Sequence, residues 1–338
     1  MLTEKQNYLK MLRGEQPEWV PKFTFGPMPG STTPVATHMF EPPLINQHRI
    51  NGGGKDIWGV NYVPTYETGF ALLPEPNNFI LDDITKWRDI IKAPSLEGID
   101  WETMVRKNVE DSGIDREQTA LAMNLHFGYF QHLMSFMGFS EGMMAMYEEP
   151  DEVKALLNYI CNFYMEVAKN TIDLYKPDIL VMMDDTAAWG APFISPEMYR
   201  EFLVPCHDRW AKMGRERGLC MTMHNCGKCE SVIDEFIKMG VNGWDPAQTC
   251  NDLAGIKAKY GNKIAIMGGW DGRGRLLAED VTDEEIRESV RTTFNMLAPG
   301  GGFACSGGFM GTIGDEETKR KNGVLRQMQD ELCHSFYK

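Results

Sequence analysis

The sequence lacks long hydrophobic runs. Its longest apolar stretches have the length of a β-strand, so no transmembrane helix is expected. Positive charge is scarce as well: 48 acidic against 34 basic residues give a net charge of −14, which makes nucleic acid and anionic membranes poor partners. The first residues lack the basic-then-apolar pattern of a signal peptide. The 8 cysteines are scattered rather than spaced as a disulfide framework. These absences predict a cytoplasmic protein that acts on a small molecule or another protein.

Phosphate-binding glycine motifs are also absent. No Gly-x-Gly-x-x-Gly or Walker sequence follows a predicted strand, which argues against a nucleotide-binding sheet. What is present is a regular alternation of strands and helices, typical of parallel βαβ units. The predicted strands lie at 178–185, 219–224, 243–246, 263–268 and 302–306. Because polar residues stand at the ends of successive strands, a (β/α)8 TIM barrel, which builds its site at those ends, fits best.

The N-terminal part predicts an extension of this barrel. A helix is expected over 3–13, a buried strand over 20–25, and a long irregular segment over 27–55 of the kind that forms lids. We therefore expect one barrel domain over 1–338, with 1–60 as helix and lid-like segment.

The most informative motif is His224-x-Cys226 at the end of the strand predicted over 219–224. An imidazole and a thiolate in this arrangement can point at one zinc ion, and a third soft ligand must then come from elsewhere. Cys305, at the end of another predicted strand, is the natural candidate. Cys229, of Cys226-x-x-Cys229, is an alternative ligand or half of a redox pair, but it is expected in the next helix. Three protein ligands leave a fourth position open, as in catalytic zinc sites.

Other polar residues should share this edge. Asp184 and Asp185 are candidate catalytic residues, as partners of the ligands or as a weak fourth ligand; a helix cap or a salt bridge is the alternative. The candidate substrate-binding residues are His126, Trp189, Asp245 and Asp271. Aromatic residues that could line a substrate, but that equally suit a core, are Trp58, Tyr62, Trp189 and Trp270.

Several stretches resemble the uroporphyrinogen decarboxylase superfamily, most clearly from about 135 to 310. They are Met137–Gly142, Glu149–Val153, Asp184–Gly190, Ile194–Phe202 and Ala298–Phe303. The resemblance implies a (β/α)8 barrel and one of two chemistries. Decarboxylases work without metal and hold a tetrapyrrole with an arginine-bearing N-terminal motif and a central aspartate. Corrinoid-linked methyltransferases bind zinc through a His-x-Cys pair and a distant Cys.

The chain is more similar to the methyltransferases. No arginine stands between Arg13 and Arg49, although a ligand with many carboxylates would need several. Asp56 is the candidate for the central aspartate, in poorly matching surroundings. The zinc pattern is matched in order by His224, Cys226 and Cys305.

The resemblance therefore implies Zn²⁺ and a methylcobamide carried by a partner corrinoid protein, since no Asp-x-His-x-x-Gly motif is found here. The methyl group would move to or from a thiol such as coenzyme M, or a methyl ether. Two thiolates and an imidazole leave zinc near zero charge, which favours a reactive bound thiolate and hence the thiol. A metal-free decarboxylase and a non-catalytic binding protein are the alternatives.

Overall fold

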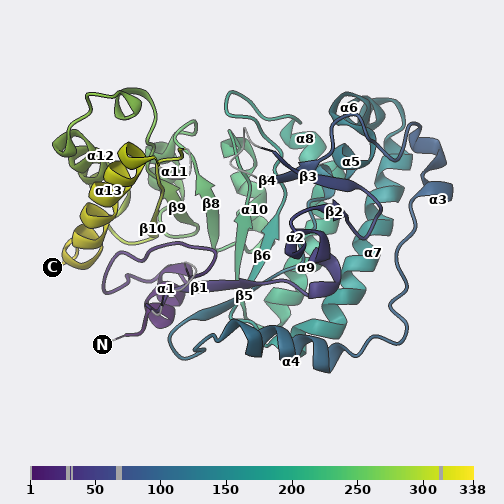
Figure 1. The fold of residues 1–338 in the computed structure, drawn as a ribbon, viewed down its shortest axis with the longest axis horizontal. Coiled ribbons are helices and arrows are strands. Elements are labelled where there is room, and N and C mark those ends of the chain that lie inside the picture. The colour runs from purple at the N-terminus through teal and green to yellow at the C-terminus, as the bar shows by residue number, and fades with distance from the viewer. Residues whose placement is uncertain (1, 28–30, 32, 66–70, 312–314) are drawn as a thin grey trace.

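The centre of the molecule is a seven-stranded parallel sheet that curls on itself, with helices along its outer face (Figure 1). The computed structural model describes residues 2–27, 31, 33–65, 71–311 and 315–338. In spatial order the strands are β1 (Thr37–Phe40), β5 (Ala120–Asn124), β6 (Ile179–Met183), β7 (Cys220–His224), β8 (Gly243–Ala247), β9 (Ala265–Gly269) and β10 (Phe303–Ser306). Each neighbouring pair is parallel. The five strands predicted from 178 to 306 are therefore confirmed as β6 to β10.

Helices connect the strands as the alternation predicted. They are α1 (Glu4–Leu12), α2 (Pro43–Ile50), α3 (Trp87–Ile90), α4 (Trp101–Ser112), α5 (Tyr129–Met137), α6 (Phe139–Glu148), α7 (Pro150–Tyr175), α8 (Pro196–Met198), α9 (Val204–Glu216), α10 (Ile233–Met239), α11 (Leu253–Tyr260), α12 (Asp283–Leu297) and α13 (Glu316–Ser335). A capping box begins α12: the side chain of Thr282 accepts the amide of Glu285. In the described part of the chain, no helix is long and apolar enough to cross a membrane.

Residues 21–25 lie between the two edge strands of the sheet. The amide of Phe23 donates to the carbonyl of Cys305 at 2.9 Å, and the amide of Cys305 donates to the carbonyl of Pro21 at 2.8 Å. On the other side, the amide of Met39 in β1 donates to the carbonyl of Phe25 at 2.7 Å. The strand predicted over 20–25 is thus an extended segment with an isolated bridge, from Lys22 to Cys305.

The prediction of an irregular segment over 27–55 is wrong in part, because β1 and α2 lie within it. Residues 28–30 and 32 of this segment lie outside the described part. A small antiparallel sheet follows, made of β2 (Gly54–Lys55), β3 (Asn61–Thr65) and β4 (Ala71–Pro74). In Figure 1 this sheet lies beside α5.

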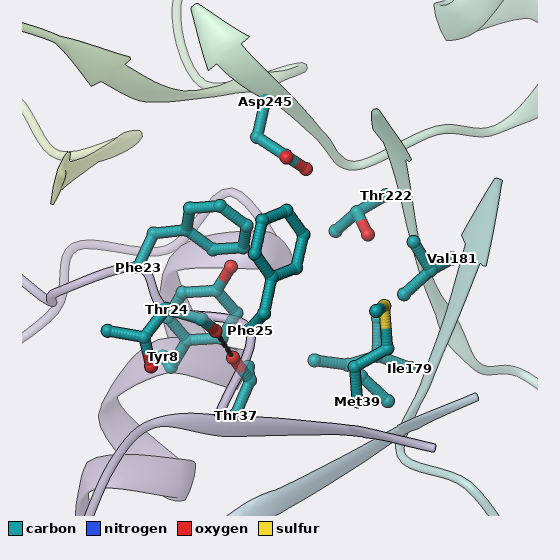
Figure 2. A pocket seen from close by; sticks show the side chains of 11 residues that line it. Tyr8, Phe23, Thr24, Phe25, Thr37, Met39, Ile179, Val181, Thr222 and Asp245 are labelled. Carbon is teal, nitrogen blue, oxygen red and sulfur yellow. Dashed lines mark hydrogen bonds between the residues drawn. The ribbon is translucent and has the colours of Figure 1, made fainter. Parts of the chain in front are cut away.

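Side chains fill the space inside the curled sheet. Figure 2 shows Asp245 and Thr222 above Phe25, with Tyr8 and Met39 below them. The void left between these residues measures about 10 Å³, no more than one water molecule occupies. A substrate must therefore bind at the rim of the sheet rather than inside it.

Candidate metal and substrate site

Three ligand atoms meet at the carboxyl ends of β6 and β7. One atom each from Asp185, His224 and Cys226 lies within 4.8 Å of the others. The Nε2 of His224 lies 3.6 Å from the Sγ of Cys226 and 3.9 Å from the Oδ1 of Asp185. All three side chains are partly accessible to solvent.

The backbone after β7 explains why these side chains converge. Gly227 has a φ of +84°, and a Cβ there would lie 2.4 Å from the carbonyl oxygen of Ala187. Only glycine allows this close approach. The amide of Cys226 donates to the Oδ1 of Asp185 at 2.7 Å, so the turn also holds the carboxylate. The other oxygen of Asp185 accepts from the Nε2 of Gln131 at 3.2 Å.

Asp245 orients the imidazole of His224. Its Oδ2 lies 2.6 Å from Nδ1 of that ring, and its side chain is 1% exposed. Burial by itself would lower the pKa of His224, but hydrogen bonds to Asp245 and Cys226 outweigh it and hold the pKa well above its ordinary range. Because Nδ1 is engaged, Nε2 is the ring nitrogen that faces the ligand group. Asp245, predicted to contact substrate, thus contacts a predicted metal ligand instead.

The group fits zinc. Bonds of about 2.3 Å to sulfur and about 2.0–2.1 Å to nitrogen, at a tetrahedral angle, place the two atoms about 3.6 Å apart. His224 and Cys226 already have this separation, 3.6 Å. A carboxylate ligand would need about 3.4 Å to the nitrogen, so Asp185 must close by roughly half an ångström. Its side chain is 32% exposed and has room to do so.

Cys305, the third ligand predicted from the sequence, lies outside this group. Along β10, Ala304 packs in the inner cluster, whereas Phe303 and Cys305 pack in the outer one. The thiol of Cys305 meets Cys333 of α13, and this hydrogen bond and burial raise its pKa well above the ordinary value. The alternative, Cys229, is also turned away: its Sγ lies 3.4 Å from the carbonyl oxygen of Asn225.

Asp184, the other candidate catalytic residue, has a structural role here. It is fully buried, and its carboxylate accepts the amides of Phe130 and Gln131 at 3.1 and 3.2 Å, at the start of α5. Its Oδ2 also lies 3.2 Å from the Nε2 of the buried His207. The helix cap and salt bridge described above as the alternative account for these contacts.

A cavity of about 440 Å³ adjoins the ligand group, with Asp185 in its wall. Its other walls come from α5, the β3–β4 hairpin and α2. The lining side chains are mostly apolar: Leu72, Leu73, Phe79, Phe130, Met134, Phe139 and Phe193. The polar lining residues include Arg49, Tyr62, His126, Gln131, His132 and Ser135.

Two of the polar lining residues, Arg49 and His126, belong to a chain of side-chain contacts that continues to Glu41. His126 lies just after β5 in the left-handed conformation, with a φ of +52°, which is uncommon outside glycine. Its Nδ1 lies 2.9 Å from the Oε1 of Glu41, and the Nη2 of Arg49 contacts its Nε2. Because a guanidinium can only donate, Nε2 must accept and Nδ1–H must donate to Glu41. Of the four residues predicted to bind substrate, His126 lines the cavity, and of the four aromatic candidates, Tyr62 does.

The remaining predicted residues lie elsewhere. Trp189 is 41% exposed and stacks under the guanidinium of Arg273, which also pairs with Asp271. That ion pair, set against partial burial, lowers the pKa of Asp271 to about 2. Trp58 is buried and donates to Tyr164, while Trp270 donates to Ser289.

Sequence reasoning missed Arg49 and Gln131, which line the cavity, and Glu41, which contacts the lining residue His126. Arg49 stood out only as the first arginine after Arg13. Its position within 27–55, the segment predicted to form a lid, was the sequence signal that could have placed it near a ligand.

Comparisons with known proteins agree with this architecture. The family model described as "Uroporphyrinogen decarboxylase (URO-D)" matches residues 126–310, more than half of the chain. "Methylcobamide:CoM methyltransferase MtaA" from Methanosarcina barkeri is 24% identical over 129 residues, which cover 38% of this chain and 37% of that protein. The alignment thus spans little more than a third of that relative. The structure is similar to that of a methyltransferase from Methanosarcina mazei, with a TM-score of 0.61 at 14% identity and all of both chains covered. From the extent of the family match, the chain belongs to the uroporphyrinogen decarboxylase family.

Proposed function

We propose that this protein is a zinc-dependent methyltransferase that moves a methyl group between a corrinoid protein and a small substrate. The observation that carries the proposal is the Asp185–His224–Cys226 group beside a cavity of substrate size. The name of the relative from Methanosarcina barkeri supports the reaction class and the corrinoid partner.

Each residue of the group has a definite task in this proposal. His224, Cys226 and Asp185 would hold zinc, and zinc bound there would activate a substrate oxygen or thiol as a Lewis acid. Asp245 fixes the imidazole, and Gln131 fixes the carboxylate. The apolar cavity walls exclude water from the substrate.

The ligand set bears on the substrate atom. With Asp185 in place of Cys305, the donors are one thiolate, one carboxylate and one imidazole. Their charges still balance those of zinc, but a carboxylate is a harder ligand than a thiolate. The proposal therefore favours an oxygen atom, as in a methyl ether, over the thiol that two cysteine ligands would favour.

A tetrapyrrole decarboxylase is less well supported. Among the described residues, Arg49 is the one arginine that lines the cavity. A ligand with many carboxylates would leave most of them without a cationic partner.

We further propose that residues 1–338 form a single closed barrel. The hydrogen bonds of residues 21–25 to both edge strands support this arrangement. The corrinoid protein would dock at the carboxyl rim, where the ligand group is accessible.

Zinc content tests the metal site directly. We expect about one zinc per chain in the parent and in Cys305→Ser, and far less in Cys226→Ser, by elemental analysis of protein never exposed to chelator. Loss of zinc in both Cys305→Ser and Cys226→Ser would restore the ligand set predicted from the sequence. A folded parent without zinc would overturn the proposal.

A further inference from the structure

We propose that the cavity binds a flat aromatic molecule that carries a carboxylate. The ring would lie against the phenylalanines and the carboxylate would meet Arg49. This inference rests on the proposed function, since it names the class of substrate that would present its methyl group to the same site.

The aromatic character of the cavity is continuous along one wall. The rings of Phe130 and Phe193 are stacked, with centroids 5.9 Å apart and planes at 11°, and Phe139 meets Phe193 edge-on at 4.7 Å. Phe79 and Tyr62 also line the cavity. Such a wall offers faces and edges to a planar ring, and aromatic pairs gain free energy beyond the area that they bury.

Arg49 provides the anion-binding group. Its guanidinium has five N–H donors, of which one nitrogen, Nη2, contacts His126. Its Nε is buried and has no hydrogen-bond partner among the described residues. Buried donors without partners are unfavourable, so a carboxylate that accepts from Arg49 would be stabilised by more than a surface contact.

The polar side chains next to Arg49 leave its positive charge available to a ligand. Burial would raise the pKa of Glu41, but His126, Asn46 and Arg49 outweigh it and lower the pKa, so Glu41 is ionised. Glu41 receives its close hydrogen bonds from His126, Asn46 and Asn124. The carboxylate of Glu41 therefore positions His126, and the remaining guanidinium donors are left for a ligand.

The charged lining residues set the orientation. Arg49, His126 and Asp185 line the same space, and Asp185 also belongs to the metal group. A ligand anchored through its carboxylate can extend along the phenylalanine wall toward Asp185. At about 440 Å³ the cavity has the size usual for a small-molecule site.

Calorimetric titration of the full chain tests this inference without any turnover. The probes are 4-methoxybenzoate and methoxybenzene, which differ by the carboxylate. We expect 4-methoxybenzoate to bind the parent about 10- to 100-fold more tightly than methoxybenzene. Arg49→Met should abolish this difference, Arg49→Lys should restore part of it, and Arg106→Met, on the exposed face of α4, should leave it unchanged.

Equal binding of the two probes to the parent, or no binding of 4-methoxybenzoate, would overturn the inference even if Arg49→Met failed to fold. The outcomes also separate the two proposals. Carboxylate-dependent binding without methyl transfer to reduced cobalamin would leave this inference standing and sink the proposed function. Methyl transfer from methylcobalamin to a thiol that Arg49→Met leaves unchanged would do the reverse.

Discussion

Two neighbouring aspartates have different surroundings, which give one a role in stability and the other a role at the ligand group. Asp184 and Asp185 follow the same strand, so their side chains leave it in different directions. Asp184 is fully buried, where it caps α5 and meets His207. Asp185 is partly exposed and joins His224 and Cys226.

Substituting each aspartate by alanine should therefore affect a different property: stability for Asp184 and zinc affinity for Asp185. Asp184→Ala removes the acceptor of the amides of Phe130 and Gln131 at the start of α5, so we expect a loss of about 1–3 kcal/mol in the free energy of unfolding. Asp185→Ala should change stability by less than about 1 kcal/mol in metal-free protein but lower zinc affinity. Urea unfolding and chelator competition measure the two effects. Equal destabilisation by both changes would contradict the separation.

At the scale of elements, Asp56 forms the turn between β2 and β3. Its Oδ1 accepts the amides of Trp58 and Val60, both at 2.9 Å. Burial raises the pKa of Asp56 to about 6, against which these hydrogen bonds act. Asp56, the candidate for the central aspartate of the decarboxylases, thus stabilises the turn before β3, the strand that contributes Tyr62 to the cavity lining.

The raised pKa predicts a pH effect with a definite sign. Between about pH 4 and 6 the folded protein binds the Asp56 proton more tightly than the unfolded chain, so the contribution of this group to stability falls as pH rises. Asp56→Asn keeps the oxygen acceptor without the charge. From pH 4 to pH 7 its stability relative to the parent should therefore rise by about 2–3 kcal/mol.

Urea unfolding at the two pH values measures this shift. Asp100→Asn is the control, because hydrogen bonds to Thr103 lower the pKa of Asp100 and reverse the expected trend. A parallel pH profile for parent and Asp56→Asn would refute the account.

On the scale of the whole molecule, the site joins strands that lie far apart in sequence. Three adjacent parallel strands contribute: Asp185 follows β6, His224 ends β7 and Asp245 lies within β8. An ion held by the first two strands would link their ends only in the folded state.

Zinc should therefore raise the melting temperature. A ligand that binds only folded protein, at about 1,000 times its Kd, stabilises it by about 4 kcal/mol. We expect an increase of several degrees in the parent and in Cys305→Ser, and little change in Cys226→Ser. Thermal unfolding with added zinc and with chelator checks this, and an equal response of all three proteins would rule out the group as the zinc site.

Local patterns predicted much of the fold. The strands from 178 onward and the placement of His224 and Cys226 both follow from short-range signals: hydrophobic runs and ligand spacing. β1 and α2 were missed, because a segment rich in proline and glycine gives weak periodicity and tertiary contacts hold it in place.

The sequence by itself determined that strands alternate with helices and that an imidazole and a thiolate stand together at one strand end. Only the tertiary structure decided the third partner. Alternate residues of a strand face opposite sides, so Cys305 points outward to Cys333, while the parallel pairing of β6 with β7 brings Asp185 to His224. Arg49 and the phenylalanines that line the cavity likewise come from separate elements. Their meeting depends on packing between distant segments, which residue order does not contain.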